Sequence, residues 1–185
     1  MRKFLIAFIF LALAVSPVFA QDRGKADSTQ NKSKKQNRGE IIWHQYDDGL
    51  KLAKEYGRHV LVNFTAKWCG YCKKMNATTF RDPEVVRMLN EDFVSIKVDG
   101  ESKKELNIDG YKITERKLTQ AEYHVRGYPA YWFLKSDGQR LGVLPGYRTA
   151  DDFLEVLYFM KESLYDKMTF DEYIKKGGRK EFSKG

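Results

Sequence analysis

The chain has 185 residues, of which 42% are hydrophobic and 31% are charged, and its net charge is +8. This length suits a single domain with a sizeable core. Six of the 33 basic residues lie in segment 21–39, which has no aromatic residue to stack on bases. The charge excess therefore does not predict nucleic-acid binding.

Residues 1–20 have the pattern of a secretory signal peptide. Basic residues precede an apolar run over 4–15, and Val18-Phe19-Ala20 supplies a cleavage site. An uncleaved membrane anchor is the alternative, but this run is short for a bilayer span of roughly 20 residues. We therefore expect cleavage near Ala20 and a periplasmic or secreted protein.

Residues 21–39 are rich in Lys, Asn, Ser and Gln and contain no apolar residue larger than Ala. Such a segment cannot bury enough surface to offset its ordering entropy, so we expect a disordered basic linker. The composition changes at Glu40, where we place the start of a folded domain over 40–167. Residues 41–43 predict a short strand, and near-helical apolar spacing then predicts a helix ending at Gly57.

The next segments alternate between strands and helices. The apolar run 60–64 predicts a central strand buried on both faces. A helical stretch to about residue 77 follows, and then a helix with Asp82 as N-cap and Pro83 at its first position. Residues 93–98 alternate in polarity and predict a strand with one apolar face turned inward.

The second half of the domain predicts two hairpins and a long helix. Asp109-Gly110 lies within the alternating segment 105–114 and favours a surface hairpin, which a helix over 114–123 follows. Strands 130–135 and 139–144 form the second hairpin. Thr149 should cap a helix whose apolar stripe packs on the sheet. For 168–185 we expect a C-terminal extension of one short helix and a frayed basic end.

Cys69-Gly70-Tyr71-Cys72 carries the chemistry. The motif follows a buried strand and opens a helix, which is the context of a redox pair. At a helix start, backbone N–H groups and the helix dipole favour the thiolate, so thiol pKa values there fall from about 8.5 to roughly 3.5–7.5. Cys69 is therefore the predicted nucleophile. Cys72, one turn deeper, would resolve the mixed disulfide.

Over residues 40–165 the chain resembles the thioredoxin superfamily. The resemblance rests on the segment 64–73 around the cysteines, on Val98-Asp99 and on Gly127-Tyr128-Pro129. It implies an α/β thioredoxin fold, a central mixed sheet flanked by helices, with an extra surface hairpin. It also implies that Pro129 is a cis-proline facing the cysteines and that the backbone of Tyr128 pairs with an extended substrate. The substrate surface implied in this way comprises Trp68, Gly70, Tyr71, Tyr128 and Pro129.

The added hairpin, Pro145-Gly146-Tyr147 and the segment 169–173 resemble SoxW-type thioredoxins of the bacterial envelope. This resemblance implies a monomeric, cofactor-free enzyme that reduces disulfides in exported proteins, with a membrane thiol–disulfide reductase as electron donor. Tyr71 would tune the reduction potential. The direction of electron transfer stays open, because a disulfide oxidase or isomerase has the same motif.

Two alternatives concern residues near the motif. Trp68 could be a core aromatic instead of a lid beside Cys69. Cys69, Cys72 and Met75 could offer soft ligands to Cu(I) in a non-catalytic metal-binding or chaperone-like module, although Met75 at helical spacing is more typical of a core. The three histidines, His44, His59 and His124, are scattered, and no metal site is predicted.

The sequence departs from the thioredoxin pattern at Asn63. Thioredoxins have a buried acid six residues before the first cysteine, where it assists deprotonation of the second, and Ser95 replaces the lysine partner of that acid. We hypothesise that water or Lys67 accepts the proton instead.

Overall fold

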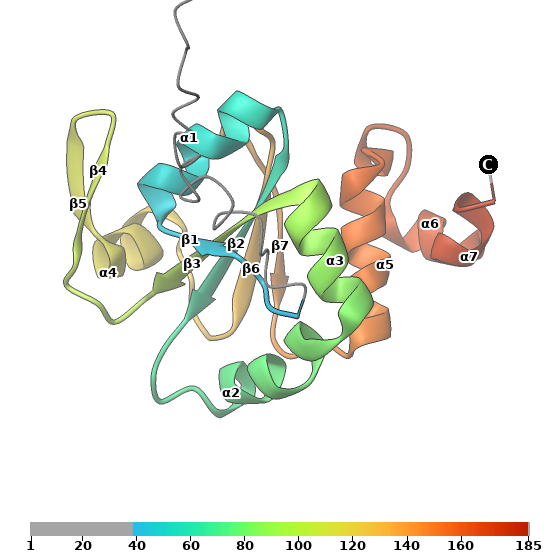
Figure 1. The fold of residues 1–185 in the computed structure, drawn as a ribbon, viewed down its shortest axis with the longest axis horizontal. Coiled ribbons are helices and arrows are strands. Elements are labelled where there is room, and N and C mark those ends of the chain that lie inside the picture. Colours follow the sequence, from blue (N-terminus) through green and yellow to red (C-terminus); the bar gives the residue numbers. More distant parts are fainter. Residues whose placement is uncertain (1–38, 185) are drawn as a thin grey trace, which may run out of the picture. The chain divides into compact units, whose positions relative to one another are not determined.

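The computed structural model describes residues 39–184. The expected signal peptide and nearly all of the expected linker lie outside the described residues. A five-stranded mixed sheet has the order β1-β3-β2-β6-β7 (Figure 1). Strands β1, β3 and β2 pair in parallel, and β6 pairs antiparallel with both β2 and β7. The strands are β1 (Trp43–His44), β2 (His59–Thr65), β3 (Phe93–Asp99), β6 (Ala130–Leu134) and β7 (Arg140–Pro145). The predicted thioredoxin architecture is confirmed.

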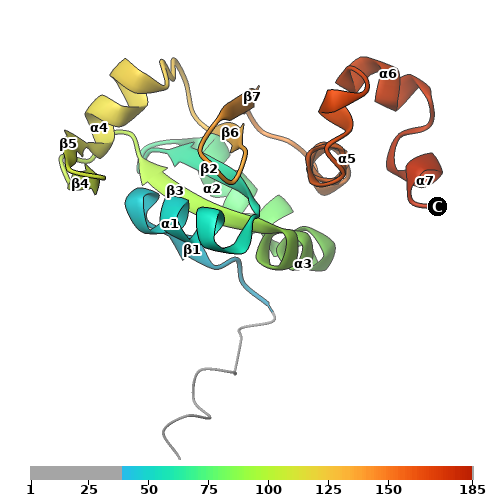
Figure 2. The same ribbon diagram turned by 90° about the horizontal axis from the view of Figure 1, so that it is seen from above.

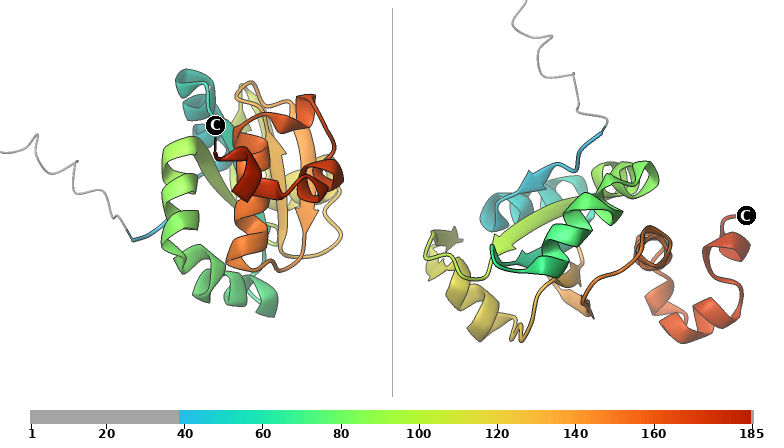
Figure 3. Two further views of the ribbon diagram at one scale, coloured as in Figure 1. Left: turned by 90° about the vertical axis from the view of Figure 1, so that its right-hand side faces the viewer. Right: turned by 90° about the horizontal axis from the view of Figure 1, so that it is seen from below.

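Two layers cover the sheet. One face packs against α1 (Tyr46–Tyr56), the hairpin β4–β5 (Glu105–Ile108 and Tyr111–Thr114), α4 (Glu115–Lys117) and the π-helical turn η3 (Leu118–Glu122). The other face packs against α3 (Pro83–Asp92) and α5 (Ala150–Lys161), which lie side by side (Figure 3). Helix α2 (Gly70–Ala77) and the 3-10 turn η2 (Thr79–Arg81) connect β2 to α3. The hairpin and α5 lie at opposite ends of the sheet (Figure 2).

Strand β2 lies at the centre of this arrangement, as its apolar sequence predicts. Val60, Val62 and Phe64 enter the cluster on the α1 face, whereas Leu61 enters the cluster on the α3 and α5 face. All four side chains are fully buried. Burial of a side chain of this size contributes about 1.5–3 kcal/mol, so β2 holds the two layers together.

The predicted apolar face of β3 is turned inward, since Val94, Ile96 and Val98 are buried. The opposite face is buried as well at Phe93 and Ser95, which are each 2% exposed, and the alternation does not predict this. The reason is tertiary, since β3 lies between β1 and β2, with α1 and α3 packed against it. A polar serine in a buried strand thus breaks the alternation without marking a solvent face.

Local signals place the element ends as expected. Gly57 ends α1 in the left-handed region at φ 64°, and the Asp82 side chain accepts hydrogen bonds from the N–H groups of Glu84 and Val85. Asp109 (φ 50°) and Gly110 (φ 93°) form the turn of the added hairpin. Positive φ at both positions is what a two-residue hairpin turn requires.

The expected frayed end is wrong. Two helices, α6 (Phe170–Lys175) and α7 (Gly178–Phe182), follow the 3-10 turn η4 (Leu164–Asp166) and pack on α5. Tyr173 is fully buried, and its hydroxyl and the Arg179 N–H both donate to the Glu155 carboxylate at 2.7 Å. The packing depends on contacts of individual residues. A short amphipathic pattern in the sequence does not reveal such contacts.

Candidate active site

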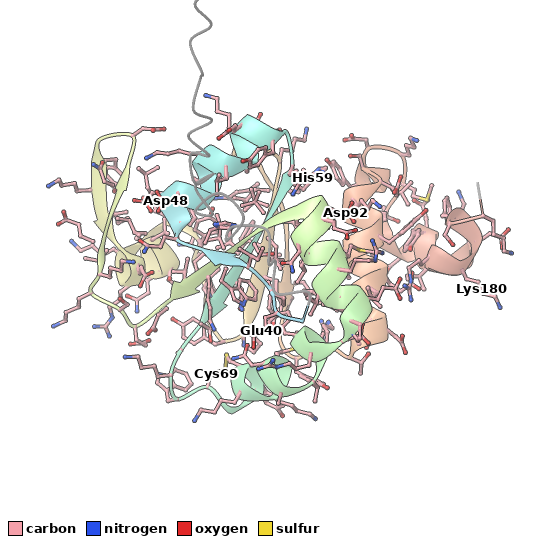
Figure 4. All side chains as sticks on the ribbon, in the orientation of Figure 1. Glu40, Asp48, His59, Cys69, Asp92 and Lys180 are labelled. Atoms are coloured by element: carbon pink, nitrogen blue, oxygen red, sulfur yellow. A yellow bond between two sulfur atoms is a disulfide. The ribbon has the colours of Figure 1, made fainter. Side chains whose placement is uncertain are left out.

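The two cysteines lie where β2 passes into α2. Cys69 is the N-cap of α2, and its sulfur accepts a hydrogen bond from the Cys72 backbone N–H at 3.0 Å. Figure 4 shows Cys69 at the start of this helix. When the pair is reduced, this N–H group and the positive end of the helix favour a thiolate on Cys69.

In the structure the pair forms a disulfide with a sulfur–sulfur distance of 2.13 Å and a Cα–Cα distance of 5.3 Å. Cys69 is 3% exposed and Cys72 is 5% exposed. Gly70 between them is exposed, and a Cβ atom there would meet nothing within 4 Å. The backbone around Cys69 is therefore open to an approaching chain.

The loop 124–129, which leads into β6, packs against the disulfide. Its Tyr128–Pro129 peptide bond is cis, and Tyr128 contacts the cluster of Ala66, Cys69 and Cys72. The Pro129 carbonyl accepts a hydrogen bond from Gly146 N–H at 2.8 Å, which ties the loop to the end of β7. Within residues 39–184, no hydrogen bond engages the backbone N–H or C=O of Tyr128. Both groups are available to an extended substrate strand.

Gly100 leaves the space that the Tyr128 side chain occupies. A Cβ at Gly100 would lie 2.0 Å from the Tyr128 hydroxyl oxygen, so the tyrosine occupies the space that a side chain would need. Burial, with Glu101 and then Asp99 nearby, raises the pKa of Tyr128 and keeps the phenol neutral. No pattern in the sequence indicates this contact, because Gly100 follows a strand and could equally serve a turn.

Exposed aromatic side chains flank the disulfide on two sides. Trp68 is 68% exposed and meets Tyr128 edge-on at 5.7 Å between ring centroids. Tyr71 is 63% exposed and lies 6.4 Å from the Tyr147 ring, above which Lys74 Nζ sits at 4.4 Å. Trp68 is therefore not a core aromatic. Its role in substrate contact, like that of Tyr71, stays a prediction.

Met75 and His59 lie away from the surface of the site. Met75 is fully buried, and its sulfur accepts a hydrogen bond from Arg148 N–H, which confirms the core interpretation. His59 begins β2, whose far end leads to the cysteines (Figure 4), and it hydrogen-bonds Tyr165 at 2.7 Å. Burial lowers the pKa of both His44 and His59. Across the described part of the chain, no group of three or more metal-ligating side chains converges.

Asn63 and Ser95 are both buried beneath the site. Asn63 is 3% exposed and its Oδ1 has no hydrogen-bond partner among the described residues, and the same holds for Ser95 Oγ. In register, Asn63 pairs with Lys97 and Ser95 with Leu61, so the two residues lie two rungs apart on the same face of β2 and β3. The side of the disulfide that faces the sheet therefore lacks an acid at the thioredoxin position.

Comparison with known proteins places this site in a family. A model of the thioredoxin-like domain matches residues 46–161. A thioredoxin from Thermus thermophilus is 32% identical, with a TM-score of 0.54 over 65% of this chain and 86% of that one. A putative disulphide-isomerase from Bacteroides thetaiotaomicron is 26% identical, with a TM-score of 0.53 over 71% of this chain and 97% of that one.

Curated relatives have thiol–disulfide names. A protein disulfide-isomerase from Hordeum vulgare is 31% identical over 58% of this chain, and the thiol:disulfide interchange protein DsbD from Neisseria meningitidis is 33% identical over 56%. The chain spans only 18% and 16% of their respective lengths. The names of these relatives refer to thiol–disulfide chemistry, and the Cys69–Cys72 pair of this chain forms a disulfide. The chain belongs to the thioredoxin-like domain family.

Proposed function

We propose that this chain is an extracytoplasmic thiol–disulfide oxidoreductase that reduces disulfides in exported proteins. The observation that carries the proposal is Cys69 at the N-terminus of α2 with the cis Tyr128–Pro129 loop packed against it. Cys69 would attack a substrate disulfide, and Cys72 would then attack Cys69 to release the reduced substrate. The signal-peptide pattern of residues 1–20 supports export.

A membrane thiol–disulfide reductase is the proposed electron donor. Support comes from the similarity to DsbD of Neisseria meningitidis, a thiol:disulfide interchange protein. Among residues 39–184 no helix is both long and apolar enough to cross a bilayer. The donor would have to reduce the Cys69–Cys72 disulfide after every turnover.

The reduction potential tests the direction of electron flow. Equilibration of the purified chain with glutathione buffers should give a potential near that of thioredoxin, about −270 mV. A value near about −120 mV, that of a strong oxidant, would overturn the reductant role. Insulin reduction by the wild type but not by Cys69→Ser would exclude a module that binds Cu(I) without turnover.

A disulfide isomerase is the second candidate. The relatives from Hordeum vulgare and Bacteroides thetaiotaomicron bear that name, the latter as a putative enzyme. Refolding of a scrambled multi-disulfide protein distinguishes the two roles, because an isomerase restores activity without net electron input. Trapping partners on the Cys72→Ser variant in cells, followed by fractionation, would test both the substrates and the location.

A further inference from the structure

A pocket of about 450 Å³ opens on the Cys72 side of the disulfide, away from the aromatic side chains that flank Cys69. Cys72 lines it together with Thr65, Asp99 and Glu115. The volume holds several waters, since each takes about 30 Å³ in the liquid. Water in this pocket would therefore connect the resolving cysteine to the two carboxylates.

The end of the sheet supplies polar side chains to this pocket. Register pairs Asn63 with Lys97 and Thr65 with Asp99 in the parallel β2–β3 ladder, so these side chains share one face at the strand ends. Three of them, Thr65, Lys97 and Asp99, line the pocket together with Cys72.

Glu115 is the unexplained group of the pocket. It is 7% exposed, yet no hydrogen bond or ion pair to its carboxylate occurs within the described residues. Its backbone is fully used, because its N–H donates to the Lys104 carbonyl and its carbonyl accepts from the Thr119 hydroxyl. The Glu115 oxygens are not among the fully buried side-chain atoms without a partner, so the carboxylate reaches the solvent of the pocket that Cys72 also lines. A carboxylate with no protein partner beside the resolving cysteine can accept a proton through that water.

The other charged side chains around the pocket, unlike Glu115, are exposed or already have a contact within the protein. Asp99 already accepts a hydrogen bond from the Glu101 N–H and is partly exposed. Lys67 and Lys73 are exposed, and Lys97 lies over the Trp43 ring at 5.8 Å. The charged and titratable side chains that face the pocket from the surrounding elements are His44, Lys67, Lys73, Lys97, Asp99 and Glu115.

We propose that Glu115 accepts the Cys72 proton through water in this pocket. It would thereby take the role of the acid that thioredoxins have at the position of Asn63. In the resolving step the Cys72 thiol loses its proton to the Glu115 carboxylate. The Cys72 thiolate then attacks the Cys69 sulfur of the mixed disulfide, the Cys69–Cys72 bond forms, and the substrate sulfur leaves as a thiolate. The proton passes from Glu115 to that thiolate or to solvent, so charge and electrons balance.

The two halves of the reaction can be timed separately with dithiodipyridine, an uncharged disulfide that releases a coloured thiopyridone. With reduced protein in excess, attack by Cys69 releases one thiopyridone, and resolution by Cys72 releases the second. We expect Glu115→Gln to leave the first release unchanged and to slow the second at least about tenfold at neutral pH. Its rate should rise tenfold per pH unit, as expected when hydroxide is the base.

Two further variants make the assignment specific. Asp99→Asn is the matched control and should release the second thiopyridone at the wild-type rate. Glu115→Asp keeps a carboxylate and should retain the wild-type shape of the pH profile, and adding Asn63→Asp to Glu115→Gln should restore the second release. A wild-type second release in Glu115→Gln, or a larger defect in Asp99→Asn, would overturn the proposal.

The inference rests on thiol–disulfide exchange at the cysteine pair and not on the proposed direction of electron flow. Loss of the first release in the wild type would count against exchange itself. A normal first release with an unchanged second release in Glu115→Gln would count against Glu115 alone.

Discussion

The two sides of the disulfide are built differently. On the Cys69 side, exposed Trp68 and Tyr71 surround open backbone near Gly70 and Tyr128. On the Cys72 side, a pocket is lined by Asp99 and by Glu115, which is 7% exposed. Under the two proposals above, the first side receives the partner protein and the second takes up the proton of Cys72. The same pair of sulfurs would then have separate surfaces for its partner and for its proton.

The largest expected effect separates the two cysteines. Cys69→Ser should reduce insulin disulfides no faster than the uncatalysed background, because only a thiolate at this position attacks. Cys72→Ser should still attack once and then stop as a mixed disulfide, which mass spectrometry detects. If Cys69→Ser forms the mixed disulfide and Cys72→Ser does not, the assignment of the two roles is reversed.

A smaller but still large effect concerns the support of the cis-proline loop. Gly100→Ala should lower the free energy of unfolding by about 1–3 kcal/mol, because the new Cβ would overlap the Tyr128 hydroxyl. Displacement of Tyr128 should also slow insulin reduction. Chemical denaturation measures the first effect and a turbidity assay the second.

Gly142→Ala is the control for that substitution. A Cβ at Gly142 would meet nothing within 4 Å, so its stability should stay within about 0.5 kcal/mol of the wild type. Equal stability of the Gly100 and Gly142 variants would show that Tyr128 moves without penalty.

The aromatic surface should matter for proteins and not for small disulfides. Trp68→Ala should lower kcat/KM for insulin about tenfold, which corresponds to about 1.4 kcal/mol of lost contact with the partner. Its reaction with dithiodipyridine should be unchanged. The control is Tyr111→Ala, an aromatic that is 57% exposed on the added hairpin. An equal loss for both substrates would assign Trp68 to the environment of the Cys69 sulfur instead.

The smallest expected effect lies on the proton side. Asn63→Asp places an acid at the thioredoxin position and should raise the rate of Cys72 attack a few-fold, visible as a shift in the pH–rate profile. An unchanged profile would show that this position does not reach Cys72.

The same variant has a stability signature with a definite sign. A carboxyl at this buried position should have a folded-state pKa above the unfolded value of about 3.9. Asn63→Asp should therefore be destabilised increasingly as pH rises above about 4 and least at acid pH. Urea titrations at acid and neutral pH measure the difference.

Much of the fold follows from local patterns. The apolar run of β2, the Asp82 cap with Pro83 and the Asp109-Gly110 turn each predict their element, because each pattern acts over a few residues. The burial of Ser95 and the packing of α7 on α5 could not be predicted in this way. Both depend on elements that approach from distant parts of the chain.

The site divides in the same manner. The sequence by itself determined the redox pair and the family, because Cys69 and Cys72 lie three residues apart at a helix start. It also predicts Cys69 as the nucleophile, because the dipole and the backbone N–H groups act locally there. Only the tertiary structure decided that Gly100 supports Tyr128 and that Glu115 shares a pocket with Cys72. Glu115 is 43 positions from Cys72 in sequence. Their side chains line one pocket only because the covering layer packs on the sheet.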